Sequence, residues 1–166
     1  TVDAVEKRPK IVEVAKEYFH LPQDKRLSVH VGDALRFLEG PRADPYDLIA
    51  VDLHNSHGMA PVVQRSEFFP CCHRLLTADG MLVINLWYGS SESEERLVRG
   101  NLAKAFKERV LYLPVAGKRN CIALAFGRSR GLDLAAARKR ARQWQKRVQI
   151  DFPALLAEMR RFNPVL

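Results

Sequence analysis

Three acidic residues, Glu6, Asp33 and Asp52, each stand at the end of a short apolar run. The runs are Val2–Val5, Leu27–Val31 and Tyr46–Val51. Runs of this kind are typical of buried parallel strands, and ligands bind beyond the carboxyl ends of such strands. A carboxylate there can bind ribose hydroxyl groups, accept a hydrogen bond from an amine or act as a general base. Each residue could also simply cap a following helix or loop.

Other side chains near these positions are weaker candidates. His54 and His57 follow Asp52 in a predicted loop, where closing over a substrate is favoured over metal binding. Cys71-Cys72-His73 falls on a predicted helix, where packing is favoured over ligation or nucleophilic chemistry. Trp87 and Tyr88 follow a fourth predicted strand and could line a substrate pocket or pack under the next loop.

Strand-like and helix-like patterns alternate along the chain, as they do in α/β domains. After the first three strands come Met81–Leu86 and then Val110–Val115 and Cys121–Phe126, which are close enough to form an antiparallel hairpin. Predicted helices cover Lys10–Phe19, Ala34–Leu38, Glu67–Leu76, Glu92–Phe106, Leu132–Val148 and Phe152–Phe162. The pattern predicts one Rossmann-like α/β domain over residues 1–166, with a core (1–126) and a helical tail (127–166). Its mostly parallel sheet ends in an antiparallel hairpin, as class I methyltransferase-type sheets do.

Composition narrows the class of protein. The chain has 166 residues, of which 47% are hydrophobic and 28% charged, as in ordinary globular domains. No apolar run approaches the ~20 residues of a membrane span, and no signal-peptide pattern is present. The three cysteines do not suggest a disulfide framework. We therefore expect a soluble, cytoplasmic protein.

The formal net charge of +8 is unevenly distributed. Residues 1–90 are slightly acidic, and most basic residues lie beyond them, densest from Arg128 to Arg147. Such a cluster could bind nucleic acid. The alternation of apolar and basic residues there favours an amphipathic helix with a solvated basic face, so nucleic-acid binding is not the expected function.

Several segments together resemble the spermidine synthase-like (polyamine aminopropyltransferase) family. The first is Val5-Glu6-Lys7-Arg8-Pro9 with the helix that follows it, and the second is Val29-His30-Val31-Gly32-Asp33-Ala34. The third is Tyr46-Asp47-Leu48-Ile49-Ala50-Val51-Asp52, and later Asp79-Gly80-Met81-Leu82-Val83-Ile84-Asn85 follows. The order and spacing of these segments, over roughly residues 1–126, carry the resemblance.

The resemblance implies a role for each matching residue. Glu6 would bind the ribose, and Asp33 with Ala34 would contact the adenine, of decarboxylated S-adenosylmethionine or S-adenosylmethionine. Asp52 would remove a proton from the attacking amine during aminopropyl transfer. Asn55 stands at the position of a family residue that contacts the amine substrate. No metal is implied.

At residue 55 the chain departs from the family pattern. The family usually has a second aspartate there, which helps to hold the diamine, whereas this chain has Asn55. An amide cannot give a cationic amine the charge-assisted hydrogen bond that a carboxylate gives. A different amine acceptor, methyl transfer on the same scaffold, or a non-catalytic binding module therefore remain alternatives.

The resemblance also implies a glycine-rich loop on a strand that would precede Thr1, in the middle of the sheet. A sheet without that strand has unpaired backbone groups at its centre, which are costly when buried. We therefore expect either a homodimer formed through a sheet edge or a rearranged strand order.

Overall fold

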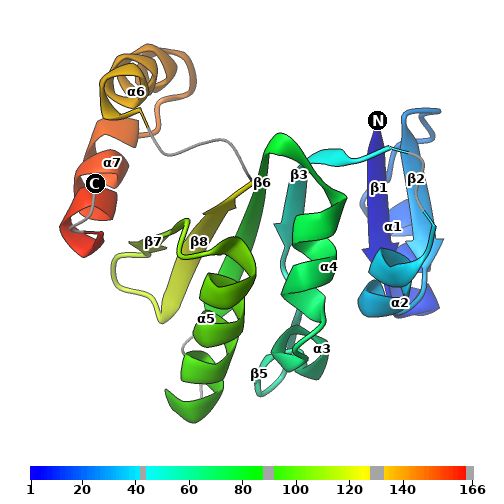
Figure 1. Cartoon of the computed structure of the whole chain (residues 1–166). Coiled ribbons are helices and arrows are strands. Elements are labelled where there is room, and N and C mark those ends of the chain that lie inside the picture. Colours follow the sequence, from blue (N-terminus) through cyan, green and yellow to red (C-terminus); the bar gives the residue numbers. More distant parts are fainter. Residues whose placement is uncertain (42–43, 88–91, 128–132, 164–166) are drawn as a thin grey trace. The chain divides into compact units, whose positions relative to one another are not determined.

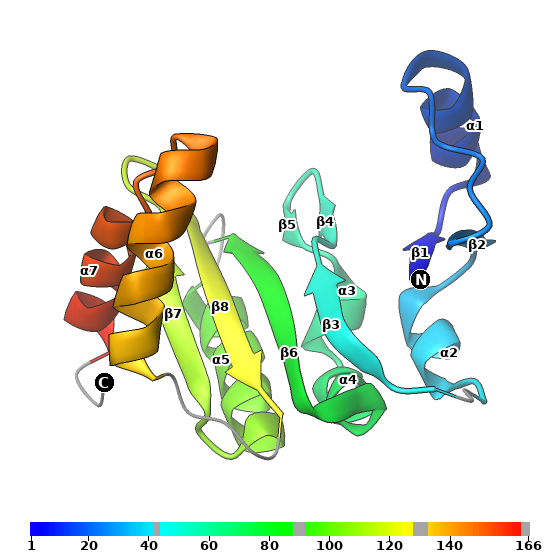
Figure 2. The same cartoon turned by 90° about the horizontal axis from the view of Figure 1, so that it is seen from above.

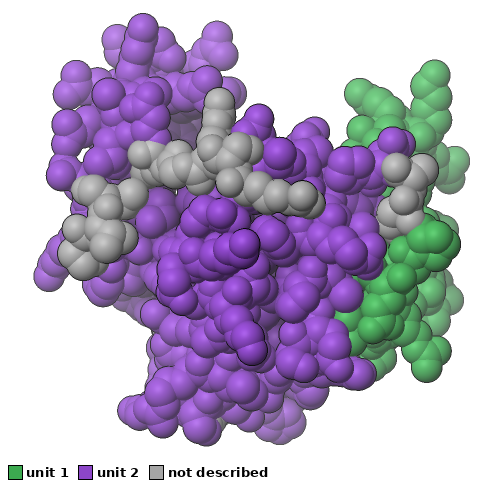
Figure 3. Space-filling view, in the orientation of Figure 1, with its two compact units in different colours: residues 1–43 green, residues 44–166 purple. Residues whose placement is uncertain are grey.

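The computed structural model of the chain describes residues 1–41, 44–87, 92–127 and 133–163. The chain divides into two compact units, Thr1–Ala43 and Asp44–Leu166 (Figure 3). The assignment of a single domain to residues 1–166 stays a prediction.

Unit 1 consists of two strand–helix pairs. Strand β1 (Val2–Glu6) is followed by helix α1 (Pro9–Tyr18), and β2 (Leu27–Val31) by α2 (Ala34–Glu39). The two strands pair in parallel, with Glu6 opposite Val31. Pro9 begins α1, where its missing N–H has no helical partner to lose. These elements lie within a residue or two of their predicted bounds.

Unit 2 is built on a four-stranded sheet of order β3-β6-β8-β7. Its elements, in chain order, are β3 (Tyr46–Val51), β4 (His54–Asn55), β5 (Gly58–Met59), α3 (Pro61–Gln64), α4 (Phe68–Leu75), β6 (Leu76–Trp87), α5 (Glu92–Phe106), β7 (Val110–Pro114), β8 (Asn120–Phe126), α6 (Leu134–Val148) and α7 (Phe152–Phe162). Strands β3 and β6 are parallel, and β8 pairs antiparallel with both β6 and β7. The predicted α/β class and C-terminal hairpin are therefore confirmed.

The core of unit 2 lies between the sheet and helices α4 and α5, which cover one face of it (Figure 1). Alternate residues of β6 point into this core, so Leu82 and Ile84 are fully buried. Helix α5 contributes Val98, Leu102 and Phe106, which are four residues apart and share one helical face. The residues of β6 on the opposite face, Asn85 among them, are only half-buried.

Strand β6 begins earlier than the sequence predicted. The predicted strand began at Met81, but the segment 77–80 also lies inside β6, where the pairing shifts from Tyr46–Leu76 to Leu48–Met81. The chain there is so close to its neighbours that a Cβ on Gly80 would lie 2.9 Å from the Tyr46 carbonyl oxygen. The turn-like composition therefore encodes a strand irregularity that requires glycine, not a chain reversal.

The C-terminal helices α6 and α7 pack against each other, and α7 packs on the edge strand β7 (Figure 2). The Asn163 side chain fastens α7 to that edge. Its Oδ1 accepts a hydrogen bond from the Tyr112 N–H (2.9 Å), and its Nδ2 donates one to the Tyr112 carbonyl oxygen (2.7 Å). An amide side chain thus satisfies the outer backbone groups of an edge strand. Among the described helices, none is long and apolar enough to cross a membrane.

Candidate active site

Asp52 follows β3 directly, at the carboxyl end of a parallel strand. Val51 pairs in register with Ile84 of β6, which sets Asp52 beside Asn85 on the next strand. Asn85 Nδ2 donates a hydrogen bond to Asp52 Oδ1 over 3.0 Å. The side chain of Asp52 is 76% exposed. The carboxylate is therefore fixed through one oxygen and still open to solvent.

A second amide extends this contact across the sheet. Asn120, at the start of β8, donates through Nδ2 to Asn85 Oδ1 over 3.0 Å. That bond orients the Asn85 amide, so its NH₂ group faces Asp52. Three adjacent strands, β3, β6 and β8, thus hold one carboxylate through the hydrogen-bonded chain Asn120–Asn85–Asp52. We call these three residues the Asp52 relay.

His54 lies against the same carboxylate. Its Nδ1 is 3.1 Å from Asp52 Oδ1, an ion pair when the imidazole is protonated. Its ring meets that of Trp87 edge-on, with the centroids 6.3 Å apart. His54 Nε2 is buried and has no hydrogen-bond partner among the described residues. Trp87 therefore packs beside the Asp52 relay; its predicted contact with substrate remains a prediction.

Asn55 closes a tight turn beside the site. The hairpin β4–β5 replaces the predicted loop, and Gly58 in it has a positive φ of 151°. Asn55 Oδ1 accepts hydrogen bonds from the N–H groups of His57 (2.8 Å) and Gly58 (3.1 Å). The amide oxygen is thus used within the turn. The predicted role of Asn55 in substrate binding stays a prediction.

In unit 1, Glu6 and Asp33 lie at the carboxyl ends of paired strands. Gly32 N–H donates to the Glu6 carbonyl oxygen over 3.0 Å, so the two strand ends are held side by side. Glu6 Oε1 accepts from the Arg8 N–H over 2.8 Å. The side chains of Glu6 and Asp33 are both 32% exposed. Two partly exposed carboxylates in this arrangement can accept hydrogen bonds from hydroxyl or amino donors of a nucleoside.

Asp33 also has the structural role that the sequence left open. Its Oδ1 accepts from the N–H groups of Leu35 (3.0 Å) and Arg36 (3.3 Å), which makes it the N-cap of α2. Its Oδ2 lies 3.9 Å from Lys7 Nζ. Ala34 is the first residue of α2. Capping uses one carboxylate oxygen, and the other faces an exposed cation.

The predicted site residues therefore form two groups, one in each unit. Glu6, Asp33 and Ala34 belong to unit 1, and Asp52, Asn55 and Trp87 to unit 2. That the three carboxylates serve one reaction, as the family resemblance implies, stays a prediction. Tyr88 lies outside the described residues.

Metal and thiol chemistry have little support in the described part of the chain. No group of three or more His, Cys, Asp or Glu side chains there could hold a metal ion. Cys72 is fully buried in the core, and burial raises the pKa of its thiol to about 12. Such a thiol is protonated and unreactive at neutral pH, as expected of a packing residue.

Sequence reasoning did not identify Asn85, Asn120 or the contact between His54 and Asp52. The available signal was a polar residue within an otherwise apolar strand, since Asn85 follows Met81-Leu82-Val83-Ile84. A buried or half-buried amide in such a strand requires a partner. Which partner it has depends on the pairing register, which the sequence does not show.

Among curated relatives, the chain is similar to the polyamine aminopropyltransferase of Chromobacterium violaceum. The two are 29% identical over 96% of this chain and 61% of the relative. The chain thus spans less than two thirds of that relative's length.

Two solved structures show the same fold. Human methyltransferase-like protein 13, in complex with SAH, superposes with a TM-score of 0.75 over 89% of this chain and 71% of that chain, at 24% identity. A spermidine synthase in complex with the transition-state analogue AdoDATO gives a TM-score of 0.67 over 99% of this chain and 59% of that one, at 13% identity. The fold is therefore that of methyltransferase-like Rossmann domains.

The match to a family is more specific than the likeness of fold. A model of the Spermine/spermidine synthase domain matches residues 1–118, which include both groups of site residues. The chain belongs to the spermine/spermidine synthase domain family.

Proposed function

We propose that this chain supplies the catalytic part of an aminopropyltransferase, in which Asp52 takes the proton of the attacking amine. The observation that carries the proposal is the Asp52 relay: a solvent-open carboxylate at a strand end, with one oxygen hydrogen-bonded to Asn85. The reaction class is supported by relatives named polyamine aminopropyltransferase. The activity and the substrates of the whole protein are part of what we propose.

Aminopropyl transfer requires the protein to align the amine with the sulfonium and to supply a base. In aminopropyl transfer, a neutral amine attacks the carbon next to a sulfonium, and the carbon–sulfur bond breaks with its electron pair going to sulfur. The proton released from the amine then passes to the Asp52 carboxylate. Asn85 fixes the carboxylate before the amine arrives, which lowers the entropic cost of the productive geometry.

Glu6 and Asp33 would bind the nucleoside part of the co-substrate, which is decarboxylated S-adenosylmethionine in this proposal. The side-by-side carboxylates at the ends of β1 and β2 suit ribose hydroxyls and an adenine amino group. A spermidine synthase of the same fold holds the analogue AdoDATO, and methyltransferase-like protein 13 holds SAH. These complexes support an adenosyl co-substrate for this chain.

The acceptor proposed here is an amine that needs no carboxylate at position 55. The Asn55 amide oxygen is engaged by the N–H groups of His57 and Gly58, so it is not offered to a cation. A diamine whose far ammonium group requires an acidic partner would bind weakly at this position. Because the Asn55 oxygen is engaged within the turn, methyl transfer from S-adenosylmethionine is the second candidate function.

The two candidates differ in their products. The intact protein that carries this chain is incubated with an amine panel and either decarboxylated S-adenosylmethionine or S-adenosylmethionine, and mass spectrometry identifies aminopropyl or methyl adducts. The proposal expects aminopropyl adducts only, from the decarboxylated donor. Methyl adducts would establish the second candidate, and no product with either donor would favour a non-catalytic binding module.

A further inference from the structure

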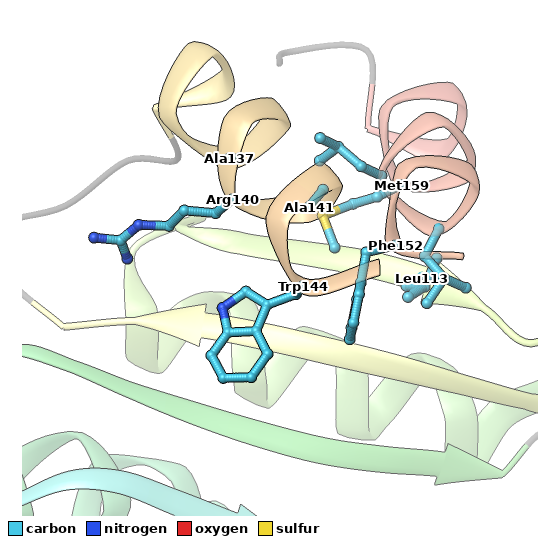
Figure 4. A pocket seen from close by; sticks show the side chains of 9 residues that line it. Leu113, Ala137, Arg140, Ala141, Trp144, Phe152 and Met159 are labelled. Carbon is cyan, nitrogen blue, oxygen red and sulfur yellow. The ribbon is translucent and has the colours of Figure 1, made fainter. Parts of the chain in front are cut away.

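An apolar pocket lies under the C-terminal helices of unit 2, at the opposite edge of the four-stranded sheet from Asp52. Its volume is about 520 Å³. Helices α6 and α7 and strand β7 form its walls (Figure 4). The lining residues are Leu113, Ala137, Arg140, Ala141, Trp144, Phe152, Leu155, Leu156 and Met159. Strands β3 and β7 are opposite edges of the four-stranded sheet, so the pocket is about 14 Å or more from β3.

The sequence of α6 explains why a cavity remains. The side of α6 that faces α7 carries two alanines, Ala137 and Ala141, where larger apolar residues would fill the space. Trp144, one turn further along, stays 50% exposed, although a tryptophan ring gains much from burial. No residue of α6 is fully buried. The pocket therefore offers apolar surface that α6 and α7 do not cover for each other.

The charge on helix α6 has one sign. Helix α6 carries six basic residues and no acidic residue between Leu134 and Val148. Arg140 is the charged residue among those that line the pocket, and Figure 4 shows its guanidinium at the side away from Leu113 and Met159. No ion pair joins Arg140 to an acidic side chain in the described part of the chain. A ligand here would meet an apolar wall and a cation together.

We propose that this pocket is a second binding site, which takes a small amphiphilic anion: an apolar chain or ring that carries one acidic group. Its volume and its mostly apolar lining with one polar group are typical of small-molecule sites. The apolar part would cover Trp144, and the acidic group would pair with Arg140. The proposal does not depend on the reaction at Asp52.

The test is calorimetric titration of the 166-residue chain with dodecanoate, below its micelle concentration. We expect binding that weakens about tenfold or more in Ala141→Leu, because the added methylene groups occupy the pocket. Arg140→Gln should weaken binding about three- to tenfold. Arg142→Gln, a change of the same kind on the same helix but outside the lining, should stay within about twofold of the parent.

Two further measurements complete the design. The quenching of Trp144 fluorescence by iodide should fall when dodecanoate binds, and Trp144→Phe identifies that signal against Trp87. Far-ultraviolet circular dichroism checks that each variant is folded; if Ala141→Leu is not, Ala137→Leu replaces it. The proposal is overturned if dodecanoate does not bind, or if filling the pocket leaves its affinity unchanged. Binding to anionic vesicles alone, unaffected by pocket filling, would also overturn it and identify a membrane-facing helix instead.

Discussion

The carboxylate of Asp52 is held through one oxygen by Asn85 and His54, and Asn120 orients Asn85 from the next strand. The three residues of the Asp52 relay have different proposed roles. Asp52 is proposed to contact the substrate, whereas Asn85 and Asn120 are positioning residues that act through it. Removing a positioning residue should therefore affect the rate of the chemical step more than the binding of substrate.

The first prediction concerns Asn85. In the intact protein, Asn85→Leu removes the donor to Asp52 without shortening the side chain. We expect kcat to fall about tenfold, because the carboxylate loses its orientation, while KM for the amine changes by less than about twofold. Asn120→Leu should give a smaller loss of the same kind. A loss confined to KM in both variants would mean that the relay binds substrate and does not position the base.

The second prediction uses the buried thiol of Cys72, whose pKa is raised by burial from 9.0 to about 12. The unfolded thiol ionises first as the pH rises, so the stabilisation is complete below about pH 9 and is lost towards about pH 12. Between about pH 8 and about pH 10 this loss amounts to about 1 kcal/mol. Denaturant unfolding at both pH values measures it.

The control is the adjacent thiol. Cys72→Ala should lose about 1 kcal/mol less stability over this pH interval than the parent chain. Cys71→Ala should lose nearly as much as the parent, because burial is the larger cause of the raised Cys72 pKa and the charge of Cys71 the smaller one. Burial also raises the pKa values of Tyr112 and Cys121, and these contributions are common to all three chains. If the two variants lost the same unfolding free energy over this pH interval, the Cys72 thiol would not be the source of the alkaline sensitivity.

At the scale of elements, helix α7 packs on strand β7, and the Asn163 side chain at its C-terminal end adds hydrogen bonds to that strand. Asn163 is 5% exposed and makes both of its Tyr112 hydrogen bonds in this environment. Asn163→Ala should lower the free energy of unfolding by about 1–2 kcal/mol, because it leaves the part-buried backbone groups of Tyr112 on β7 unpaired. Thermal and urea unfolding measure the change.

Arg160→Ala is the matched change on the exposed side of α7 and should cost less than about 0.5 kcal/mol. If Asn163→Ala cost no more than this control, water would be satisfying Tyr112 and α7 would not protect the sheet edge. Dodecanoate binding can be measured in the same two variants, because α7 forms one wall of the proposed pocket.

The sequence predicts the elements better than it predicts their contacts. Apolar runs locate β1, β2 and β3 to within a residue, because parallel strands have a strong compositional signal. The burial that this signal predicts is not observed, since no residue of β1 or β2 is fully buried and Val51 is the buried residue of β3. The early start of β6 was missed, because a glycine-containing strand irregularity has the composition of a turn. The link from Asn163 to Tyr112 spans 51 residues, and no local pattern encodes it. Asp52 was identified, whereas its partner Asn85 depends on the register between β3 and β6.

At the scale of the whole molecule, the sheets of both units end in strands that have one paired edge among the described strands. Among the described strands, β1 pairs with β2 alone and β3 with β6 alone. Leu48 on β3 is 55% exposed. Exposed strand edges recruit other strands, so we propose that the 166-residue chain by itself forms a homodimer through β3.

Light scattering after size exclusion measures the mass of the isolated chain. The dimer should weaken in Leu48→Lys, which places a charge on the exposed strand, and should persist in the control Leu97→Lys on α5, where the replaced side chain is 48% exposed. A monomer at all concentrations would contradict the homodimer proposal.

The central claim is that Asp52 acts on the amine and not on the nucleoside. Its most direct test is Asp52→Asn in the intact protein, with turnover and affinity for the thioether product nucleoside measured on the same sample. The account predicts that kcat falls about 10²–10⁴-fold while nucleoside affinity stays within about twofold. Equal turnover in the variant, or a loss of nucleoside affinity as large as the loss of turnover, would contradict it.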